Sequence, residues 1–143
     1  MPLNVYLIFN GDCRQAVEFY GQVFNSEPRI MAFGDAPPNP EFPIPDEAKN
    51  LVMHAELMIQ GSKVMFSDTF PGSPFVKGNN IQLTVMSMNV DEIKSIFEKL
   101  KDGGKVEMDL QETFWSKCYG KLTDKFGMEW QVSHDDGGAH RGE

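Results

Sequence analysis

Apolar and polar residues alternate along residues 111–133, near the end of the chain, and this pattern predicts a β-hairpin. The alternation is clearest in the second strand, which reads Met128, Glu129, Trp130, Gln131, Val132 and Ser133. The tight turn ends at Gly127, and the aromatic residues Phe114, Trp115 and Tyr119 lie just upstream. We expect one face of this hairpin to pack on a core and the other to form one wall of a small-molecule cup.

The first half of the chain predicts a strand, a helix, a second strand and a hairpin, from apolar runs and their spacing. These elements cover residues 4–9, 13–25, 29–33, 51–60 and 63–67. Asp12 precedes the helix, with Gln15 three positions later, which is the pattern of a capping box. Gly61 marks the turn of the hairpin. His54 and Glu56 share one face of the first hairpin strand, opposite its apolar residues.

The same order restarts after residue 80, with a strand, a helix capped by Asn89, another strand and the closing hairpin. These elements cover residues 81–86, 89–102, 105–110 and 111–133. Such a duplication predicts an α+β fold class of two βαβββ modules that form a cupped mixed sheet. We expect one domain over residues 1–134, with modules at 1–68 and 81–134. The sheet faces without a helix are expected to curve together around a cavity.

Three segments fall outside this pattern. Residues 34–50 hold five prolines, which remove backbone donors and fix φ, so we expect a surface excursion there and a candidate lid. Residues 68–80 are rich in Gly, Pro and Asn and predict a linker between the modules. Residues 135–143 have almost nothing apolar to bury and predict a disordered tail.

Composition and charge narrow the partners. A formal net charge of -8 and a pI near 4.8 oppose binding to nucleic acid and favour a cationic small molecule. Cys13 and Cys118 form no CxxC pattern, so neither a disulfide framework nor a thiolate zinc site is indicated, and both thiols are expected to be inert. No basic leader and no apolar run of membrane-spanning length occur, so we expect a soluble cytoplasmic protein with no membrane partner. The methionines of the strands fit an adaptable lining of a core or of a pocket, and of the two we expect them to fill the core.

Three stretches carry a resemblance to a known family. They read GDCRQAVEFYGQVFNSEP after the first strand, HAELMIQGSKVMFSD in the first hairpin and ETFWSKCYGKLTDKFGMEWQV in the second. In these stretches the chain resembles the PhnB-like branch of the vicinal oxygen chelate superfamily, relatives of glyoxalase I and of bleomycin-resistance proteins. The resemblance covers about residues 1–134 and implies the glyoxalase/bleomycin-resistance/dioxygenase fold and a homodimer.

Metal-dependent members of this superfamily hold a divalent ion with His, Glu or Gln side chains, and the resemblance carries those positions onto this chain. They fall at Val5, at Glu56, at Asn80 or Gln82, and at Gln131. Only Glu56 and Gln131 match the ligand pattern, whereas three or four ligands are normally needed. We therefore expect no cofactor and no complete metal centre. A site for Zn, Ni, Mn or Fe rebuilt from His54, Glu56 and Gln131 is the alternative.

Some members of this branch carry the label of a demethylubiquinone methyltransferase. This chain has no glycine-rich strand-to-helix loop of the type that holds an adenosyl cofactor, and its pattern predicts no parallel sheet on which to place one. Methyl transfer is therefore not expected.

The candidate substrate-binding residues are His54, Glu56, Phe114, Trp115, Tyr119 and Gln131. His54 and Glu56 fit an acid/base or ligand pair, and they also fit a plain hydrogen-bonded pair on a polar sheet face. The aromatic residues fit a platform for a flat substrate or a subunit interface. Gln131 fits a substrate contact or a solvated position. Asp124 is expected to bond to its own backbone in the turn and not to act as an acid.

These residues leave more than one class of function open. The first is a small-molecule binding or modifying protein of the PhnB-like type without a complete metal centre. The second is a divalent-metal-dependent lyase, isomerase or dioxygenase of the same superfamily. A third is an interaction module with a vestigial pocket. No Gly-x-Ser-x-Gly elbow, P-loop or clustered Cys/His motif occurs, which excludes several large enzyme classes.

Overall fold

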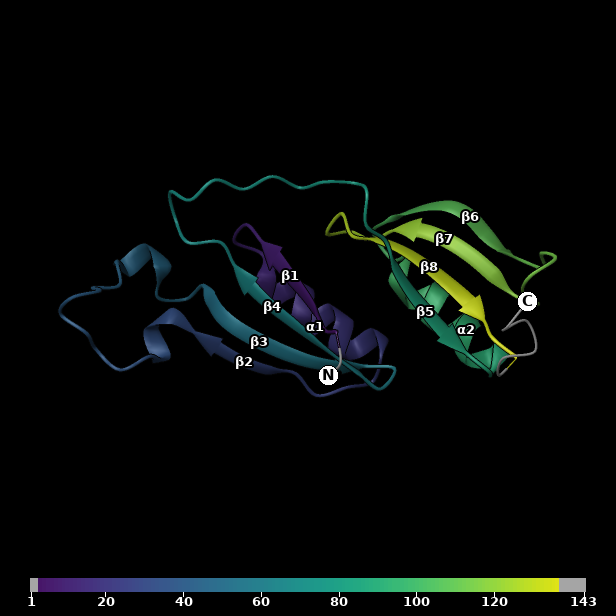
Figure 1. Cartoon of the computed structure of the whole chain (residues 1–143), viewed down its shortest axis with the longest axis horizontal. Coiled ribbons are helices and arrows are strands. Elements are labelled where there is room, and N and C mark those ends of the chain that lie inside the picture. Colours follow the sequence, from purple (N-terminus) through teal and green to yellow (C-terminus); the bar gives the residue numbers. More distant parts are fainter. Residues whose placement is uncertain (1–2, 137–143) are drawn as a thin grey trace. The chain divides into compact units, whose positions relative to one another are not determined.

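The chain divides into two compact units, Met1–Lys77 and Gly78–Glu143, in the computed structural model, which describes residues 3–136. Within these described residues, each unit contains one α-helix and one four-stranded sheet (Figure 1). Apart from Asp135 and Asp136, the tail predicted to be disordered lies outside the described residues. No helix in residues 3–136 combines the length and the apolar character needed to cross a membrane.

The first unit has the predicted order of strand, helix, strand and hairpin. Its elements are β1 (Val5–Phe9), α1 (Cys13–Val23), β2 (Arg29–Ala32), the 3₁₀ turns η1 (Phe33–Asp35) and η2 (Asp46–Ala48), β3 (Val52–Ile59) and β4 (Ser62–Asp68). The sheet order is β1-β4-β3-β2, with β1 parallel to β4 and the other pairs antiparallel. No ladder strand runs through the proline-rich residues 34–50, as predicted.

The second unit repeats this plan. Its elements are β5 (Leu83–Ser87), α2 (Val90–Leu100), β6 (Lys105–Gln111), β7 (Tyr119–Thr123) and β8 (Glu129–His134). The order β5-β8-β7-β6 has the same pairing directions, which confirms the duplicated α+β pattern. Asn89 caps α2 as predicted, because its side chain accepts a hydrogen bond from the backbone N–H of Glu92 at 3.1 Å. The predicted strand start at Ile81 is wrong by two residues, since the ladder with β8 begins at the pair Leu83–Trp130.

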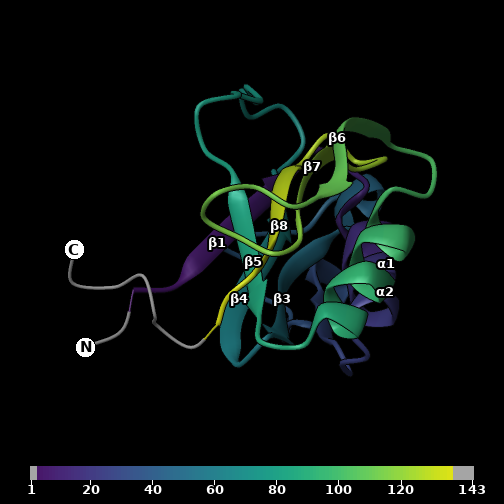
Figure 2. The same ribbon diagram turned by 90° about the vertical axis from the view of Figure 1, so that its right-hand side faces the viewer.

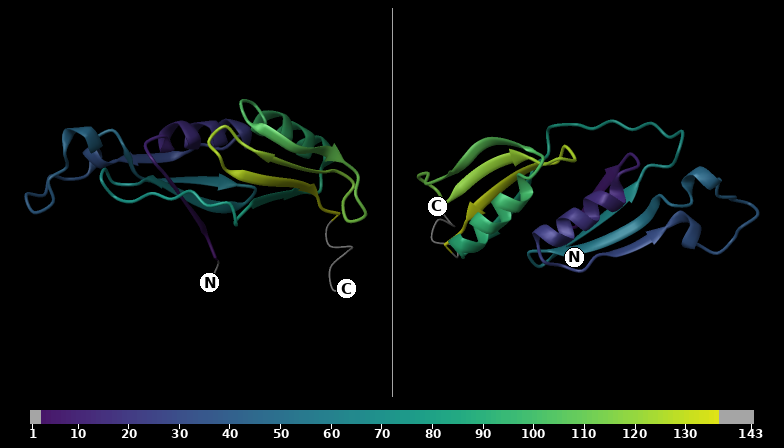
Figure 3. Two further views of the ribbon diagram at one scale, coloured as in Figure 1. Left: turned by 90° about the horizontal axis from the view of Figure 1, so that it is seen from above. Right: turned by 180° about the vertical axis from the view of Figure 1, so that it is seen from behind.

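Each helix covers one face of the sheet in its own unit (Figure 3), and Figure 2 shows α2 to one side of β5 and β8. In the first unit, the Tyr20 ring of α1 lies 6.1 Å from the Phe66 ring of β4, and both side chains are fully buried. In the second unit, Phe97 and Leu100 of α2 are buried, as is Trp130 of β8. The helical period of 3.6 and the strand period of 2 place these residues on the facing sides.

The sheet face that carries no helix is the open face of each unit, and methionines lie on it. Met31, Met58 and Met86 are 47%, 50% and 49% exposed, and none of the methionines at described positions is buried. The prediction that they fill the core is therefore wrong. Alternation along a strand gives the reason, because Met58 follows the buried Leu57 and so points away from α1. The open faces thus surround their polar groups with flexible apolar side chains.

The N-terminus of α1 is capped by a residue that lies far along the chain. The predicted capping box of Asp12 and Gln15 is wrong, because Asp12 makes no side-chain capping bond. Instead Oδ1 of Asp68 accepts hydrogen bonds from the backbone N–H groups of Gly11 and Cys13 at 2.8 and 3.0 Å. Asp68 is the buried last residue of β4 and does not begin the linker.

Candidate functional site

The β7–β8 hairpin depends on a turn that Asp124 organises. Oδ1 of Asp124 accepts hydrogen bonds from the backbone N–H groups of Phe126 and Met128 at 2.8 and 3.0 Å, and Oδ2 accepts one from Trp130 Nε1 at 2.7 Å. Gly127 has a φ of +86°, a left-handed conformation that glycine adopts without strain. Asp124 is therefore a turn residue, as predicted, and it also ties the turn to the core. This turn sets the register of the polar residues of β8 beside β7.

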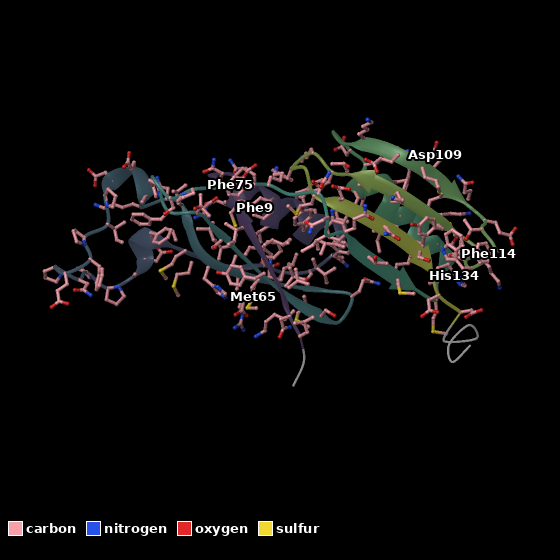
Figure 4. The ribbon with its side chains drawn as sticks, turned by 45° about the horizontal axis from the view of Figure 1, so that its top comes forward. Phe9, Met65, Phe75, Asp109, Phe114 and His134 are labelled. Atoms are coloured by element: carbon pink, nitrogen blue, oxygen red, sulfur yellow. The ribbon has the colours of Figure 1, made fainter. Side chains whose placement is uncertain are left out.

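Three aromatic side chains form a ladder at the other end of the hairpin. The ring centroids of Phe114 and Trp115 are 4.7 Å apart and those of Trp115 and Tyr119 are 5.3 Å apart, both edge-to-face. Phe114 is 93% exposed, Trp115 44% and Tyr119 only 7%, so the ladder runs from solvent into the sheet. We call these three residues the aromatic ladder. Figure 4 shows Phe114 near the end of β8, where His134 lies.

The loop that carries the ladder is held by Ser116. The buried hydroxyl of Ser116 lies 3.0 Å from the carbonyl oxygen of Cys118 and 2.9 Å from that of His134. A hollow of about 260 Å³ opens beside this loop, and Phe114 and Trp115 are part of its lining. The lining of this hollow includes neither Tyr119 nor Gln131, so the hollow belongs to the loop. The half-exposed indole of Trp115 borders it.

A line of hydrogen bonds continues from the ladder across the open face. Tyr119 Oη donates to Gln131 Oε1 at 2.6 Å, Gln131 Nε2 donates to Gln82 Oε1 at 2.7 Å, and Gln82 Nε2 donates to Glu129 Oε1 at 3.2 Å. Burial raises the pKa of Tyr119, so its hydroxyl stays protonated and donates at neutral pH. We call Gln82, Gln131 and Glu129 the polar row. Strand pairing explains the row, because β8 lies between β5 and β7 in the sheet.

The open face of the first unit carries a different polar cluster. Tyr6 Oη lies 3.2 Å from His54 Nδ1, and His54 Nε2 lies 3.2 Å from Glu56 Oε2. Lys63 Nζ lies 3.8 Å from the other Glu56 oxygen. The hydrogen bond from His54, helped by the positive charges of Lys63 and Arg29, lowers the pKa of Glu56. Glu56 is therefore a carboxylate at neutral pH.

The predicted site residues thus come together in two groups. His54 and Glu56 are in direct contact in the first unit. The connected set in the second unit comprises Phe114, Trp115, Tyr119 and Gln131. Sequence reasoning missed Tyr6 altogether and considered Gln82 only as a metal position. The period of two in a strand could have identified Tyr6. Phe9 of β1 is buried on the face that α1 covers, and Tyr6, three positions earlier, points to the opposite face of the sheet.

The divalent metal that the family resemblance implies does not fit these residues. Within residues 3–136, no three His, Cys, Asp or Glu side chains come together to hold an ion. His54 and Glu56 supply two donor side chains and bond to each other, whereas a protein site normally uses three or four. Valine at position 5 has no donor atom.

An adenosyl cofactor does not fit the strand-to-helix turn of the first unit either. Such cofactors are held by free backbone N–H groups of a glycine-rich turn at a helix N-terminus. Here the N–H groups of Gly11 and Cys13 already donate to the Asp68 carboxylate. These two N–H groups are therefore not available to a cofactor.

Both cysteines are free and buried. Burial, reinforced by the nearby Asp68 carboxylate, raises the pKa of the Cys13 thiol, and burial raises that of Cys118. The thiolate is the reactive form, so both features agree with the predicted inertness.

The sequence and structure of this chain are similar to those of known proteins. The chain matches a protein-family model described as 3-demethylubiquinone-9 3-methyltransferase over residues 2–133. It is 35% identical to Protein YjdN of Escherichia coli (strain K12) over 144 residues, which cover 93% of this chain and 95% of that protein. The crystal structure of protein PA1353 from Pseudomonas aeruginosa is 32% identical, with a TM-score of 0.83 and coverage of 94% of this chain and 98% of that one.

Two further structures extend the comparison. A PhnB protein from Bacillus cereus is 27% identical, with a TM-score of 0.74 and coverage of 94% of this chain and 100% of that one. A glyoxylase/bleomycin resistance protein/dioxygenase domain from Frankia sp. EAN1pec is 13% identical, with a TM-score of 0.65 and coverage of 94% and 96%. At that identity it shows the fold alone. The glyoxalase/bleomycin-resistance-like fold predicted from the sequence is confirmed.

Proposed function

The chain belongs to the PhnB-like family described as 3-demethylubiquinone-9 3-methyltransferase, and on this premise we propose that it binds a small molecule on the open face of its second unit. The ligand is flat and carries hydrogen-bonding groups along one edge. It stacks on Trp115 and bonds to Gln131 and Gln82. The net charge of -8 favours a ligand with positive charge.

The observation that carries this proposal is the continuity between the aromatic ladder and the polar row. Tyr119 belongs to both. Its ring centroid lies 5.3 Å from that of Trp115, and its hydroxyl donates a hydrogen bond to Gln131 Oε1 at 2.6 Å. Small-molecule sites typically combine an aromatic lining with a few placed polar groups. The amide of Gln131 uses one N–H in the row and has a second to offer, so it can meet a carbonyl edge of a ligand.

Trp115→Ala is expected to weaken ligand binding by about 1 to 3 kcal/mol, which is roughly 5- to 150-fold in Kd, because stacking on an aromatic platform has that magnitude. The indole is 44% exposed, so its removal leaves the core intact. Ligands are sought by thermal shift, with catechols and glycopeptide antibiotics as flat or cationic candidates and α-ketoacids and phosphonates as anionic comparators, which we expect to bind more weakly. Titration calorimetry then gives the Kd of wild type and variant for each compound that binds.

Phe42→Ala is the matched control, since Phe42 is 71% exposed and lies outside both open faces, in the proline-rich segment. It should leave Kd unchanged. A second arm uses Gln131→Leu, which removes the hydrogen bonds of Gln131 to Tyr119 and Gln82 and should weaken binding, against the exposed Gln22→Leu of α1, which should not. Equal Kd values for wild type and Trp115→Ala contradict the site. If no compound binds, and Trp115→Ala has a lower sedimentation coefficient than wild type, the aromatic ladder would instead be assigned to a homodimer interface.

Methyl transfer is not part of this proposal, although the family description names it. The turn between β1 and α1 has its N–H groups engaged by Asp68, and each sheet contains one parallel pair among antiparallel ones. The nucleotide-binding folds that hold adenosyl groups use a mostly parallel sheet with a free glycine-rich turn. We therefore assign binding, and no transfer step, to this chain.

Elemental analysis of the purified protein is expected to find Zn, Ni, Mn and Fe well below one ion per chain. The reason is that His54 and Glu56 supply only two donor side chains. The measurement is mass spectrometry of the metals in wild type and Glu56→Ala after dialysis. A stoichiometric ion that Glu56→Ala loses would replace the binding function by a metal-dependent lyase, isomerase or dioxygenase.

A further inference from the structure

The cluster on the open face of the first unit takes no part in the binding site proposed for the second. Tyr6 lies on β1, His54 and Glu56 lie on β3, and β4 separates the two strands in the sheet. The hydroxyl of Tyr6 nevertheless reaches His54 Nδ1 at 3.2 Å, and the opposite nitrogen of His54 reaches Glu56 at 3.2 Å. The ring centroids of Tyr6 and His54 are 5.7 Å apart. This is a continuous line of phenol, imidazole and carboxylate.

The direction of the hydrogen bonds follows from the chemistry of the groups. An ionised carboxylate can only accept hydrogen bonds. The proton of the His54–Glu56 pair therefore lies on His54 Nε2, which donates a hydrogen bond to Glu56. In the neutral imidazole the other nitrogen, Nδ1, then has a free lone pair. That lone pair accepts a hydrogen bond from the Tyr6 hydroxyl. His54 is thus in the tautomer that can remove a proton from Tyr6.

We propose that Tyr6 is an activated nucleophile toward small electrophiles that carry a displaceable group, with His54 as its general base. Glu56 positions His54 and stabilises the imidazolium that forms. A nucleophile bonded to a base, with a third group orienting that base, is the arrangement that activates weak nucleophiles in enzymes. As Tyr6 Oη forms a bond to the electrophile, its proton passes to His54 Nδ1. The displaced group leaves with the electron pair of the broken bond.

The surroundings of Tyr6 suit this role. Its side chain is 44% exposed, so an electrophile can reach the oxygen. Ile8 and Met31, 51% and 47% exposed, provide apolar surface on the same face. The charged groups that face Glu56 are Lys63 of β4 and Arg29, its pairing partner on β2. Both are cations, so they favour the carboxylate.

Benzenesulfonyl fluoride is a suitable probe, because attack by Tyr6 Oη forms an oxygen–sulfur bond, breaks the sulfur–fluorine bond and releases fluoride. The full chain is treated at neutral pH, and labelled peptides are quantified by mass spectrometry over time. We expect Tyr6 to be labelled. The rate should fall about 100-fold or more in His54→Phe, the usual size of a general-base contribution. In Glu56→Gln it should fall at least about 10-fold, since a neutral amide stabilises the imidazolium less.

Two comparisons separate activation from mere exposure. Met58→Leu, on the open face of β3, should label at the wild-type rate. Free N-acetyltyrosine amide, whose hydroxyl is fully exposed and has no base beside it, should label far more slowly than Tyr6. Equal labelling of Tyr6 in wild type and His54→Phe, with both folded by circular dichroism, would overturn the proposal, as would an unlabelled Tyr6 in wild type. Neither result depends on Trp115, so the binding site of the second unit is tested separately.

Discussion

Replacing Asp68 by alanine is expected to destabilise the first unit by about 3 to 5 kcal/mol, because it leaves three backbone donors, two of them in buried hydrogen bonds, without their acceptor. The carboxylate is 5% exposed and accepts from Gly11 and Cys13 through Oδ1. Its other oxygen accepts from the N–H of Val52 at 2.9 Å. One side chain thus joins the end of β4 to the start of α1 and the start of β3. Few single substitutions in this unit remove so many connections.

Urea denaturation followed by far-UV circular dichroism measures this loss. Both tryptophans, Trp115 and Trp130, lie in the second unit, so their fluorescence does not report on the first. Hydrogen exchange at the amide of Val52 gives a local readout and should accelerate strongly. Asp109→Ala is the matched control, since Asp109 is an exposed residue of β6 (Figure 4) and should stay within about 0.5 kcal/mol of wild type. Equal stability of the two variants would contradict the role of Asp68.

The second unit should respond to Asp124→Ala in a comparable way, with a loss of about 3 to 4 kcal/mol. Asp124 is 3% exposed, and its carboxylate accepts from two turn amides and from the indole N–H of Trp130. Removing it leaves the buried Trp130 Nε1 without this acceptor and frees the β7–β8 turn. Tryptophan fluorescence against urea measures the change, with Trp115→Phe as background so that Trp130 is the reporter.

A double-mutant cycle with Trp130→Phe isolates the indole bond from the turn. Far-UV circular dichroism follows its urea denaturation, because this substitution removes the fluorescent reporter. Phenylalanine keeps an aromatic ring and removes the N–H, so the coupling free energy between positions 124 and 130 should be about 1 to 3 kcal/mol. A coupling near zero, with Asp124→Ala still destabilising, would restrict Asp124 to the turn alone. The aromatic ladder and polar row stand on the same hairpin, so ligand binding should weaken in parallel with the loss of the turn.

Much of the fold could be predicted because its signals are local. Alternation in residues 128–133 identified β8 and its buried face, and Gly61 and Gly127 marked turns where φ is +83° and +86°. Asn89 was recognised as a cap because its side chain and the N–H of Glu92 that it caps lie three residues apart in the sequence. The same rule failed at Asp12, where the pattern was present but Asp68 from β4 supplies the bond. The methionines were misassigned because hydrophobic character does not tell which face of a strand is covered.

Residue types and their spacing were enough to establish two βαβββ modules, the order of their elements and the face on which His54, Glu56 and Gln131 lie. They could not establish which side chains meet. The contacts of Tyr6 with His54, Gln82 with Gln131 and Cys13 with Asp68 join residues 48, 49 and 55 positions apart. Periodicity describes each strand against its own core, whereas such pairs depend on which strand lies beside which. That order arises only when the whole sheet assembles. It brings polar residues that are distant in the sequence together as the Tyr6–His54–Glu56 cluster and the polar row.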